Sequence, residues 1–307
     1  MYRLIIFCFA ALFALPAFAR VSVVVTLTPQ KYVVSNIAKD KADVSVMVPA
    51  GSSPHTYEPK PRQMAELSKA DIYLSIGDPS EHAWLDKFAD MNKKMLIVHT
   101  DKGIKKLDMA EHHHHDEDGD HDEHGDHDEH GEHEDHDDDH GHDHEHGMKD
   151  PHIWLDPILL SVQADAAAKA LVKADPANAS FYGANLKKFQ GEMKSLDKKI
   201  SAMAQKTKNK KFMVFHPSWG YFAARYGYEQ IPVEVDGKAP KAQELVELIH
   251  TAKEHNLKIV FVQPQFSKKE AETIAKEAKA KVFPIDPLAE NVGDTLIRAA
   301  KAIYDNQ

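Results

Sequence analysis

The sequence predicts an α/β protein of two lobes, each with a mostly parallel sheet flanked by helices, joined by one long rigid helix. Three observations predict it. In each half, short β-branched runs alternate with helical periodicity, which is typical of parallel sheets. Between the halves a single apolar stripe with helical spacing runs from Tyr182 to Met203. The chain of 307 residues is also long enough for two lobes of ordinary domain size.

Within each half, alternating or continuous apolar runs indicate strands, and apolar residues three and four apart indicate helices. In the first half the expected strands are 21–26, 42–48, 71–76 and 95–98, and the expected helices are 31–39 and 59–70. In the second half the expected strands are 212–215, 229–235, 259–262 and 282–285, and the expected helices are 219–226, 241–255, 268–280 and 292–304. This alternation predicts two parallel sheets, the second with helices on both faces.

The connecting helix is the clearest element of the sequence. Its apolar residues follow one another at alternating intervals of four and three: Tyr182, Leu186, Phe189, Met193, Leu196, Ile200 and Met203. Asp175 and Pro176 supply an N-cap and a first-turn proline. From there to Lys206 a helix would extend about 45 Å, enough to span both lobes. The stripe is therefore structural and carries no chemistry.

The first 19 residues are typical of a cleaved secretory signal, with Arg3, an apolar run and an Ala-Phe-Ala ending at Ala19. The run is too short for a transmembrane helix, so no stable membrane insertion is expected. The only cysteine, Cys8, lies inside the signal, so the mature chain has no thiolate ligand for a metal. The expected domains are a signal peptide at 1–19, an N-terminal lobe at 20–158 with an insertion at 111–147, a helical connector at 159–206 and a C-terminal lobe at 207–307.

The insertion at 111–147 contains only 14 His, 18 Asp or Glu and 5 Gly. Without apolar side chains to bury, it predicts a solvated and flexible segment. Imidazole and carboxylate are common zinc ligands, so its composition indicates a metal-collecting surface with many weak sites. An acidic spacer that binds no metal is the alternative. The candidate accessory ligands are His112, His113, His114, His115, His121, His124, His127, His130, His133, His136, His140, His142, His144 and His146.

The insertion also accounts for the acidic balance of the chain. The formal net charge is −10, and the insertion alone carries −18, so the rest of the chain sums to +8. No basic stripe with interleaved aromatic residues accompanies that charge, so nucleic-acid binding is not expected.

Outside the insertion, three histidines stand next to prolines at or near the ends of apolar elements: His55, His152 and His216. A carboxylate, Asp286, ends the last expected strand beside another proline. Ligands of open α/β sheets bind beyond the carboxyl ends of strands, where these residues are expected. Prolines stiffen the backbone that presents a ligand. The four residues together indicate a preformed metal site. The remaining histidines, at 82, 99, 250 and 255, lack such surroundings and are expected to be ordinary surface residues.

Several segments resemble the periplasmic metal-specific solute-binding proteins of ABC transporters, the cluster A-I or zinc-uptake type. These segments are VPAGSSPHTYEPKP at 48–61, the stretch from Ala70-Asp71 through Glu81 to Trp84-Leu85, DPHIWLDP at 150–157, His216 with GYFAARYG at 220–227, and IDP at 285–287. They span nearly all of the mature chain in the expected order, and DPHIWLDP is quite specific.

The resemblance implies two α/β lobes joined by one rigid helix, with metal bound between the lobes, and often a histidine-rich loop at this position. Carried over by motif, it implies that His55, His152, His216 and Asp286 are the ligands. Manganese-binding members commonly have a glutamate where this chain has His216, and three imidazoles with one carboxylate suit Zn(II) better than Mn(II). Some zinc members have an acid before the first histidine, whereas this chain has Pro54. The fourth position is therefore open between Asp286 and a water.

The expected function is high-affinity capture of Zn(II) in the periplasm and its delivery to the membrane permease of an ABC-type zinc importer, by a monomer that is not an enzyme. One alternative is a manganese- or iron-specific receptor of the same class. Another is a zinc buffer that acts mainly through the insertion. A zinc hydrolase is the last, and no HEXXH motif supports it. In the leading interpretation the insertion is accessory, a reservoir or sensor that is dispensable for tight binding.

Overall fold

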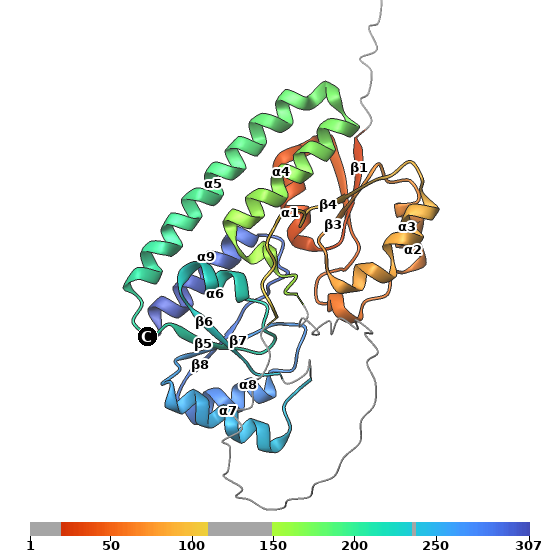
Figure 1. Cartoon of the computed structure of the whole chain (residues 1–307). Helices are drawn as coiled ribbons and strands as arrows, with labels where there is room; N and C mark the ends of the chain where they lie inside the picture. The colour runs from red at the N-terminus through yellow and green to blue at the C-terminus, as the bar shows by residue number, and fades with distance from the viewer. Residues whose placement is uncertain (1–19, 110–148, 235–237) are drawn as a thin grey trace, which may run out of the picture.

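The structure is a computed structural model that describes residues 20–109, 149–234 and 238–307 (Figure 1). The expected signal peptide at 1–19 and the insertion at 111–147 lie outside the described residues. Two four-stranded sheets form the framework of the described part. The strands of the first sheet are β1 (Val21–Val25), β2 (Ala42–Val46), β3 (Ile72–Ser75) and β4 (Leu96–His99). Those of the second are β5 (Lys211–Val214), β6 (Glu229–Pro232), β7 (Ile259–Val262) and β8 (Lys281–Pro284).

The two sheets share one topology. Their strand orders are β2-β1-β3-β4 and β6-β5-β7-β8, and every neighbouring pair is parallel. Since all strands of a sheet run the same way, their carboxyl ends gather at one edge, where ligands of such sheets bind. The predicted fold class, with two parallel sheets flanked by helices, is confirmed.

The helices follow the predicted order with small shifts at their ends. They are α1 (Thr28–Ala38), α2 (Pro61–Leu67), α3 (Leu85–Met91), α4 (Pro157–Ala174), α5 (Ala179–Lys206), α6 (Gly220–Tyr226), α7 (Ala242–Glu254), α8 (Lys269–Ala278) and α9 (Val292–Asp305). Short 3-10 turns are η1 (Lys39–Lys41), η2 (Pro54–Thr56), η3 (Pro79–Ala83), η4 (Ile153–Leu155) and η5 (Pro176–Asn178). Helix α1 starts three residues earlier than the predicted 31–39 because Pro29 fits its first turn. Helix α3 is not among the predicted elements.

The predicted long helix is α5, with 28 residues, which follows directly after η5. Figure 1 shows it along one side of the molecule, reaching from the first sheet to the second. Its stripe packs inward as expected, with Tyr182, Phe189, Met193 and Ile200 buried. The remaining stripe residues, Leu186, Leu196 and Met203, are partly buried against the same core. Packing is therefore the role of this stripe.

One hydrophobic core runs through both halves of the molecule. It includes β1 and β3 of the first sheet, α4, α5 and α9, and one face of the second sheet through Phe212, Val214 and Phe261. The alternate residues Met213 and Val260 point to the other face and form a second cluster with α7 and α8. The second sheet is thus covered on both faces, as predicted.

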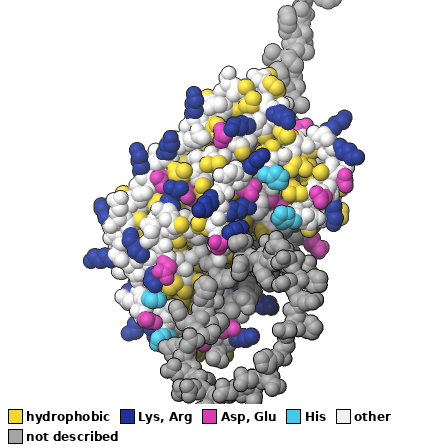
Figure 2. All heavy atoms as spheres, in the orientation of Figure 1, with side chains coloured by type: hydrophobic (Ala, Val, Ile, Leu, Met, Phe, Trp, Pro, Cys, Tyr) yellow, Lys and Arg dark blue, Asp and Glu magenta, His cyan; other side chains and the backbone are white. Residues whose placement is uncertain are grey.

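On the face that Figure 2 presents, the basic side chains form no single stripe. No helix among residues 20–109, 149–234 and 238–307 is long and apolar enough to cross a membrane. Figure 2 shows Lys and Arg side chains scattered over this face among Asp and Glu. The positive charge of that face is therefore dispersed.

Candidate metal centre

Polar side chains follow each strand of the second sheet at its carboxyl edge. His216 comes after β5, Glu234 after β6, Gln263 after β7 and Asp286 after β8. The strand register explains why these residues meet. Val214 pairs with Pro232 on one side and with Phe261 on the other, so His216 lies between Glu234 and Gln263, each two residues further along. The expectation that His216 and Asp286 lie beyond strand ends is confirmed.

His152 reaches the same place by another route. It follows no strand, so the expectation of a strand end was wrong for this residue. The reason is that the segment 150–157 turns directly into α4: His152 precedes η4, and Asp156 then caps the helix by accepting hydrogen bonds from Ile158 N at 2.7 Å and Leu159 N at 3.2 Å. Asp156 also pairs with Arg225 of α6 at 2.5 Å, and this pairing opposes the rise that burial causes in the pKa of Asp156.

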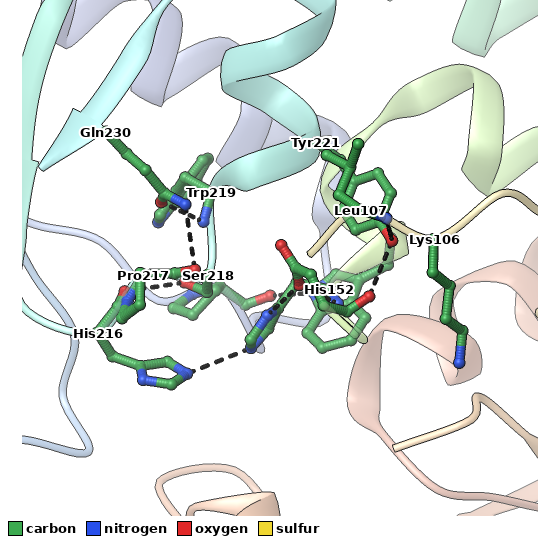
Figure 3. Close-up of polar contacts among 12 residues, drawn as sticks. Lys106, Leu107, His152, His216, Pro217, Ser218, Trp219, Tyr221 and Gln230 are labelled. Atoms are coloured by element: carbon green, nitrogen blue, oxygen red, sulfur yellow. Dashed lines mark hydrogen bonds and ion pairs between the residues drawn. The ribbon is translucent and has the colours of Figure 1, made fainter. Parts of the chain in front are cut away.

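The imidazoles of His152 and His216 face each other across the junction of the two halves (Figure 3). Their Nε2 atoms lie 3.3 Å apart. Both residues are buried, with 4% and 8% of their surface exposed. Two residues 64 positions apart in the sequence are thus brought together by the fold.

Each of these imidazoles is held by a buried carboxylate. His152 Nδ1 lies 2.7 Å from Asp150 Oδ1, and His216 Nδ1 lies 2.7 Å from Glu234 Oε1. Ionised carboxylates only accept hydrogen bonds, so each Nδ1 carries the proton and donates it. In a neutral imidazole with its proton on Nδ1, Nε2 is the nitrogen that presents a lone pair, and the two Nε2 atoms face each other. Carboxylates that orient histidines in this way are typical of metal sites.

A small cavity of about 20 Å³ adjoins the two histidines. It has room for about one water-sized sphere. Its lining consists of Ser53, Pro54, His152, Trp154, His216, Gln265, Phe266, Pro287 and Leu288. Pro54 belongs to η2, the turn that also carries His55. The backbone of the predicted first ligand therefore lies beside the other two histidines, while the His55 side chain lies outside what the structure describes.

Asp286 lies next to the cavity in the chain but does not line it. Its neighbours Pro287 and Leu288 do line the cavity. Its Oδ1 accepts hydrogen bonds from Gln265 Nε2 and from Leu288 N, both at 2.9 Å. In the part of the chain that the structure describes, no three His, Cys, Asp or Glu side chains gather closely enough to hold a metal. The structure thus brings His152 and His216 together, and it places Gln265, which donates to Asp286, in the wall of the same cavity.

The histidines that were expected to be ordinary surface residues form no second metal site among the described residues. His82 and His99 are exposed, and His250 is 80% exposed with only Glu254 near it, at 3.8 Å. His255 follows the last residue of α7. The accessory histidines of the insertion lie outside the described residues. Asp150, Glu234 and Gln265, in contrast, are functional candidates that the sequence pattern did not single out.

The two chain segments that flank the insertion are tied directly to the histidine site. Asp108 and Lys149 form an antiparallel bridge, and Asp150 N donates to Leu107 O at 2.9 Å. Tyr221 of α6 joins both segments, because its hydroxyl accepts from Leu107 N at 3.1 Å and donates to Asp150 O at 2.8 Å (Figure 3). Burial raises the pKa of Tyr221 to about 12, so the hydroxyl keeps the proton that it donates.

A family model described as the periplasmic zinc-uptake complex component A matches residues 23–305. The chain belongs to this zinc-uptake family. Among curated relatives, the high-affinity zinc uptake system protein ZnuA of Haemophilus influenzae is 34% identical over 303 residues, covering 92% of this chain and 90% of the relative. The protein of the same description from Bacillus subtilis is 33% identical over 276 residues, covering 88% and 79%.

Solved structures agree with this membership. A crystal structure of ZnuA has a TM-score of 0.79 and 39% identity, with 94% of this chain and 99% of that chain covered. An internal deletion mutant of ZnuA with zinc bound has a TM-score of 0.78 and 38% identity, with 94% and 98% covered. The chain thus belongs to a periplasmic zinc-uptake family, and the expected metal, zinc, is confirmed.

Proposed function

We propose that this protein captures Zn(II) in the periplasm through a site at the junction of its two sheets and delivers it to the membrane permease of an ABC-type importer. The observation that carries the proposal is the buried pair His152 and His216, whose Nε2 atoms face each other at 3.3 Å. Each ring is already oriented by a carboxylate, so little order has to be gained on binding. Nitrogen donors of this kind suit Zn(II).

The proposed ligands are the imidazoles of His55, His152 and His216, with Asp286 or a water in the fourth position. His55 fits this set because its neighbour Pro54 lines the cavity beside the other two histidines. A site with four protein or water ligands around one ion fits capture, whereas the hydrolase alternative needs a general base and an open substrate position beside the metal.

The remaining parts of the proposal concern the chain as a whole. Residues 1–19 direct secretion and are removed, and the mature protein acts as a monomer without enzymatic activity. The histidines of 111–147 act as an accessory reservoir or sensor of zinc. Binding at the main site weakens in acid because imidazole must be neutral to coordinate zinc.

The decisive experiment measures zinc binding by competition with a chelator of known affinity. Wild-type protein is expected to retain one tightly held zinc, and His216→Ala is expected to lose it. His250→Ala is the matched control, because this histidine is 80% exposed and does not line the cavity. If His216→Ala retains the tight zinc as the control does, the proposed site is wrong.

A deletion of 111–147 separates the receptor from a buffer that acts through the insertion. The receptor hypothesis expects the tight site to survive while the total zinc capacity falls. Loss of the tight site together with the insertion would favour the buffer. Metal content after purification from a mixed-metal medium separates the zinc receptor from a manganese or iron receptor.

A further inference from the structure

We propose that Gln265 completes the zinc site by accepting a hydrogen bond from a zinc-bound water, and that Asp286 acts on the metal only through Gln265. This inference rests on the proposed zinc-binding function and assigns the fourth coordination position. Gln265 is thereby a positioning residue, and the fourth metal ligand is a water.

The orientation of the Gln265 amide is fixed by its partner. Its Nε2 donates to Asp286 Oδ1 at 2.9 Å. A carboxylate accepts and does not donate, so the amide has to present its nitrogen to Asp286 and its oxygen elsewhere. That oxygen, Oε1, is buried and accepts no hydrogen bond from any residue that the structure describes. A buried acceptor without a donor is costly, and a water in the site supplies one.

The position of Gln265 points to the zinc site as the place of that water. Gln265 lines the cavity of about 20 Å³ together with His152 and His216. The cavity has room for about one water-sized sphere, and polar groups on its wall are what an ordered water requires. Because Gln265, His152 and His216 all line this cavity, a water in it adjoins all three residues.

The Oδ1 atom of Asp286 already accepts from two donors, Gln265 Nε2 and Leu288 N, and the residue does not line the cavity. Pro287, which follows Asp286 and lines the cavity, is also held in place, because Trp154 Nε1 donates to its carbonyl oxygen at 2.8 Å. The carboxylate therefore holds the amide in place and strengthens the negative end of its dipole, and the amide in turn faces the site.

The chemistry of an amide suits a transport site. Zinc makes a bound water a strong hydrogen-bond donor. An amide oxygen accepts that hydrogen bond but is too weak a base to remove the proton, whereas a carboxylate in the same place would act as a general base. The water is held and not activated, and it leaves when the ion is released.

The test compares four single variants of the full chain, and one double variant of Gln265 and Asp286, by chelator competition with zinc. Gln265→Leu is expected to weaken zinc binding about 10- to 100-fold, as the loss of an outer hydrogen bond at a metal site does. Asp286→Ala releases Gln265 and is expected to show a similar loss, without a further loss in the double variant. Asp286→Asn keeps an acceptor for Gln265 and Leu288 N, so its loss is expected to be smaller than that of Gln265→Leu. Gln163→Leu, at a buried amide in α4 that lines no part of the cavity, is the matched control.

A crystal structure of the zinc-loaded protein distinguishes Gln265 as the acceptor for a zinc-bound water from Gln265 as a residue that only supports the fold. The expected oxygen on zinc is a water within hydrogen-bond distance of Gln265 Oε1. A carboxylate oxygen of Asp286 bound directly to zinc, or an Asp286→Asn loss exceeding that of Gln265→Leu, overturns the inference. If wild-type protein holds no tight zinc at all, the proposed function fails first. If it does and Gln265→Leu matches the Gln163→Leu control, the assignment of Gln265 alone is wrong.

Discussion

His152 and His216, the two described histidines of the proposed zinc site, are oriented by the same chemistry but anchored in different ways. Asp150, only two residues before His152, accepts from both the ring Nδ1 and the backbone N of His152, at 2.7 and 2.8 Å. At His216 these tasks are divided. Glu234 holds the ring, whereas Gln263 holds the backbone by accepting from His216 N at 3.2 Å and donating to His216 O at 2.7 Å. We call Asp150 the local anchor, because one side chain near in sequence holds both the ring and the backbone of His152. Glu234 and Gln263 form a tertiary anchor, because two residues that follow different strands share these tasks at His216.

The largest effect is expected at the local anchor. Asp150→Ala removes the acceptor for both the ring and the backbone of His152, so zinc affinity is expected to fall about 10- to 100-fold. Because a buried backbone donor loses its partner, the zinc-free protein is expected to lose about 1–3 kcal/mol of unfolding free energy. Chelator competition and urea denaturation measure the two quantities. Unchanged stability of the zinc-free protein would show that the backbone contact contributes nothing.

Glu234→Ala separates the two tasks. The ring of His216 loses its orienting partner, so zinc affinity is expected to fall within the same range of about 10- to 100-fold. The backbone stays bound to Gln263, so the stability of the zinc-free protein is expected to fall by less than in Asp150→Ala. Urea denaturation of the two variants side by side tests the contrast. An equal loss of stability in both would remove the distinction between local and tertiary anchors.

Gly220→Ala disturbs the local anchor from outside. A Cβ at Gly220 would lie 2.6 Å from Asp150 Oδ2, which is closer than non-bonded atoms approach, so the carboxylate has to move. We expect zinc affinity to fall about tenfold, less than in Asp150→Ala because the carboxylate remains in the site. Gly191→Ala is the matched control, since a Cβ there would meet nothing within 4 Å. Wild-type zinc affinity in Gly220→Ala would show that the position of Asp150 is not critical.

The smallest effect is expected from Tyr221→Phe, which deletes one hydroxyl that joins Leu107 N to Asp150 O. Since the Asp150 side chain still holds His152, zinc affinity is expected to change by under about threefold. The hydrogen bonds lost lower the unfolding free energy by about 1 kcal/mol. Thermal unfolding and chelator competition on the same sample check both values. A large loss of zinc affinity would show that the segments flanking the insertion determine the position of His152.

The fold was largely predictable because its signals are local. Hydrophobic periodicity located all eight strands and the long helix, and the stripe of α5 packs as its spacing predicts. The errors lie at element ends and in short elements. Strand β6 ends at Pro232, three residues before the expected end, and the seven-residue α3 has too few residues to show a period. The predicted domain boundaries remain predictions.

The site was predictable only where chain neighbours define it. Proline-flanked histidines pointed to His152 and His216, whose Nε2 atoms lie 3.3 Å apart in the structure. Glu234 escaped prediction because only the register of β5 with β6 brings it to His216. Gln265 escaped because glutamine is not a usual zinc ligand. Attention falls on it only because its buried side-chain oxygen has no hydrogen-bond donor among the described residues. The metal roles of His55 and Asp286 remain proposals.

The continuous core that joins the first sheet, α5 and one face of the second sheet has a calorimetric consequence. Because this core is shared by both halves, we expect the two halves to unfold together in a single calorimetric transition. An ion bound at their junction then stabilises every part of the chain at once. With free zinc at about 1,000 times its dissociation constant, that linkage amounts to about 4.1 kcal/mol. The melting temperature therefore rises with the fraction of molecules that hold zinc, and zinc-bound and zinc-free molecules differ in their susceptibility to proteolysis.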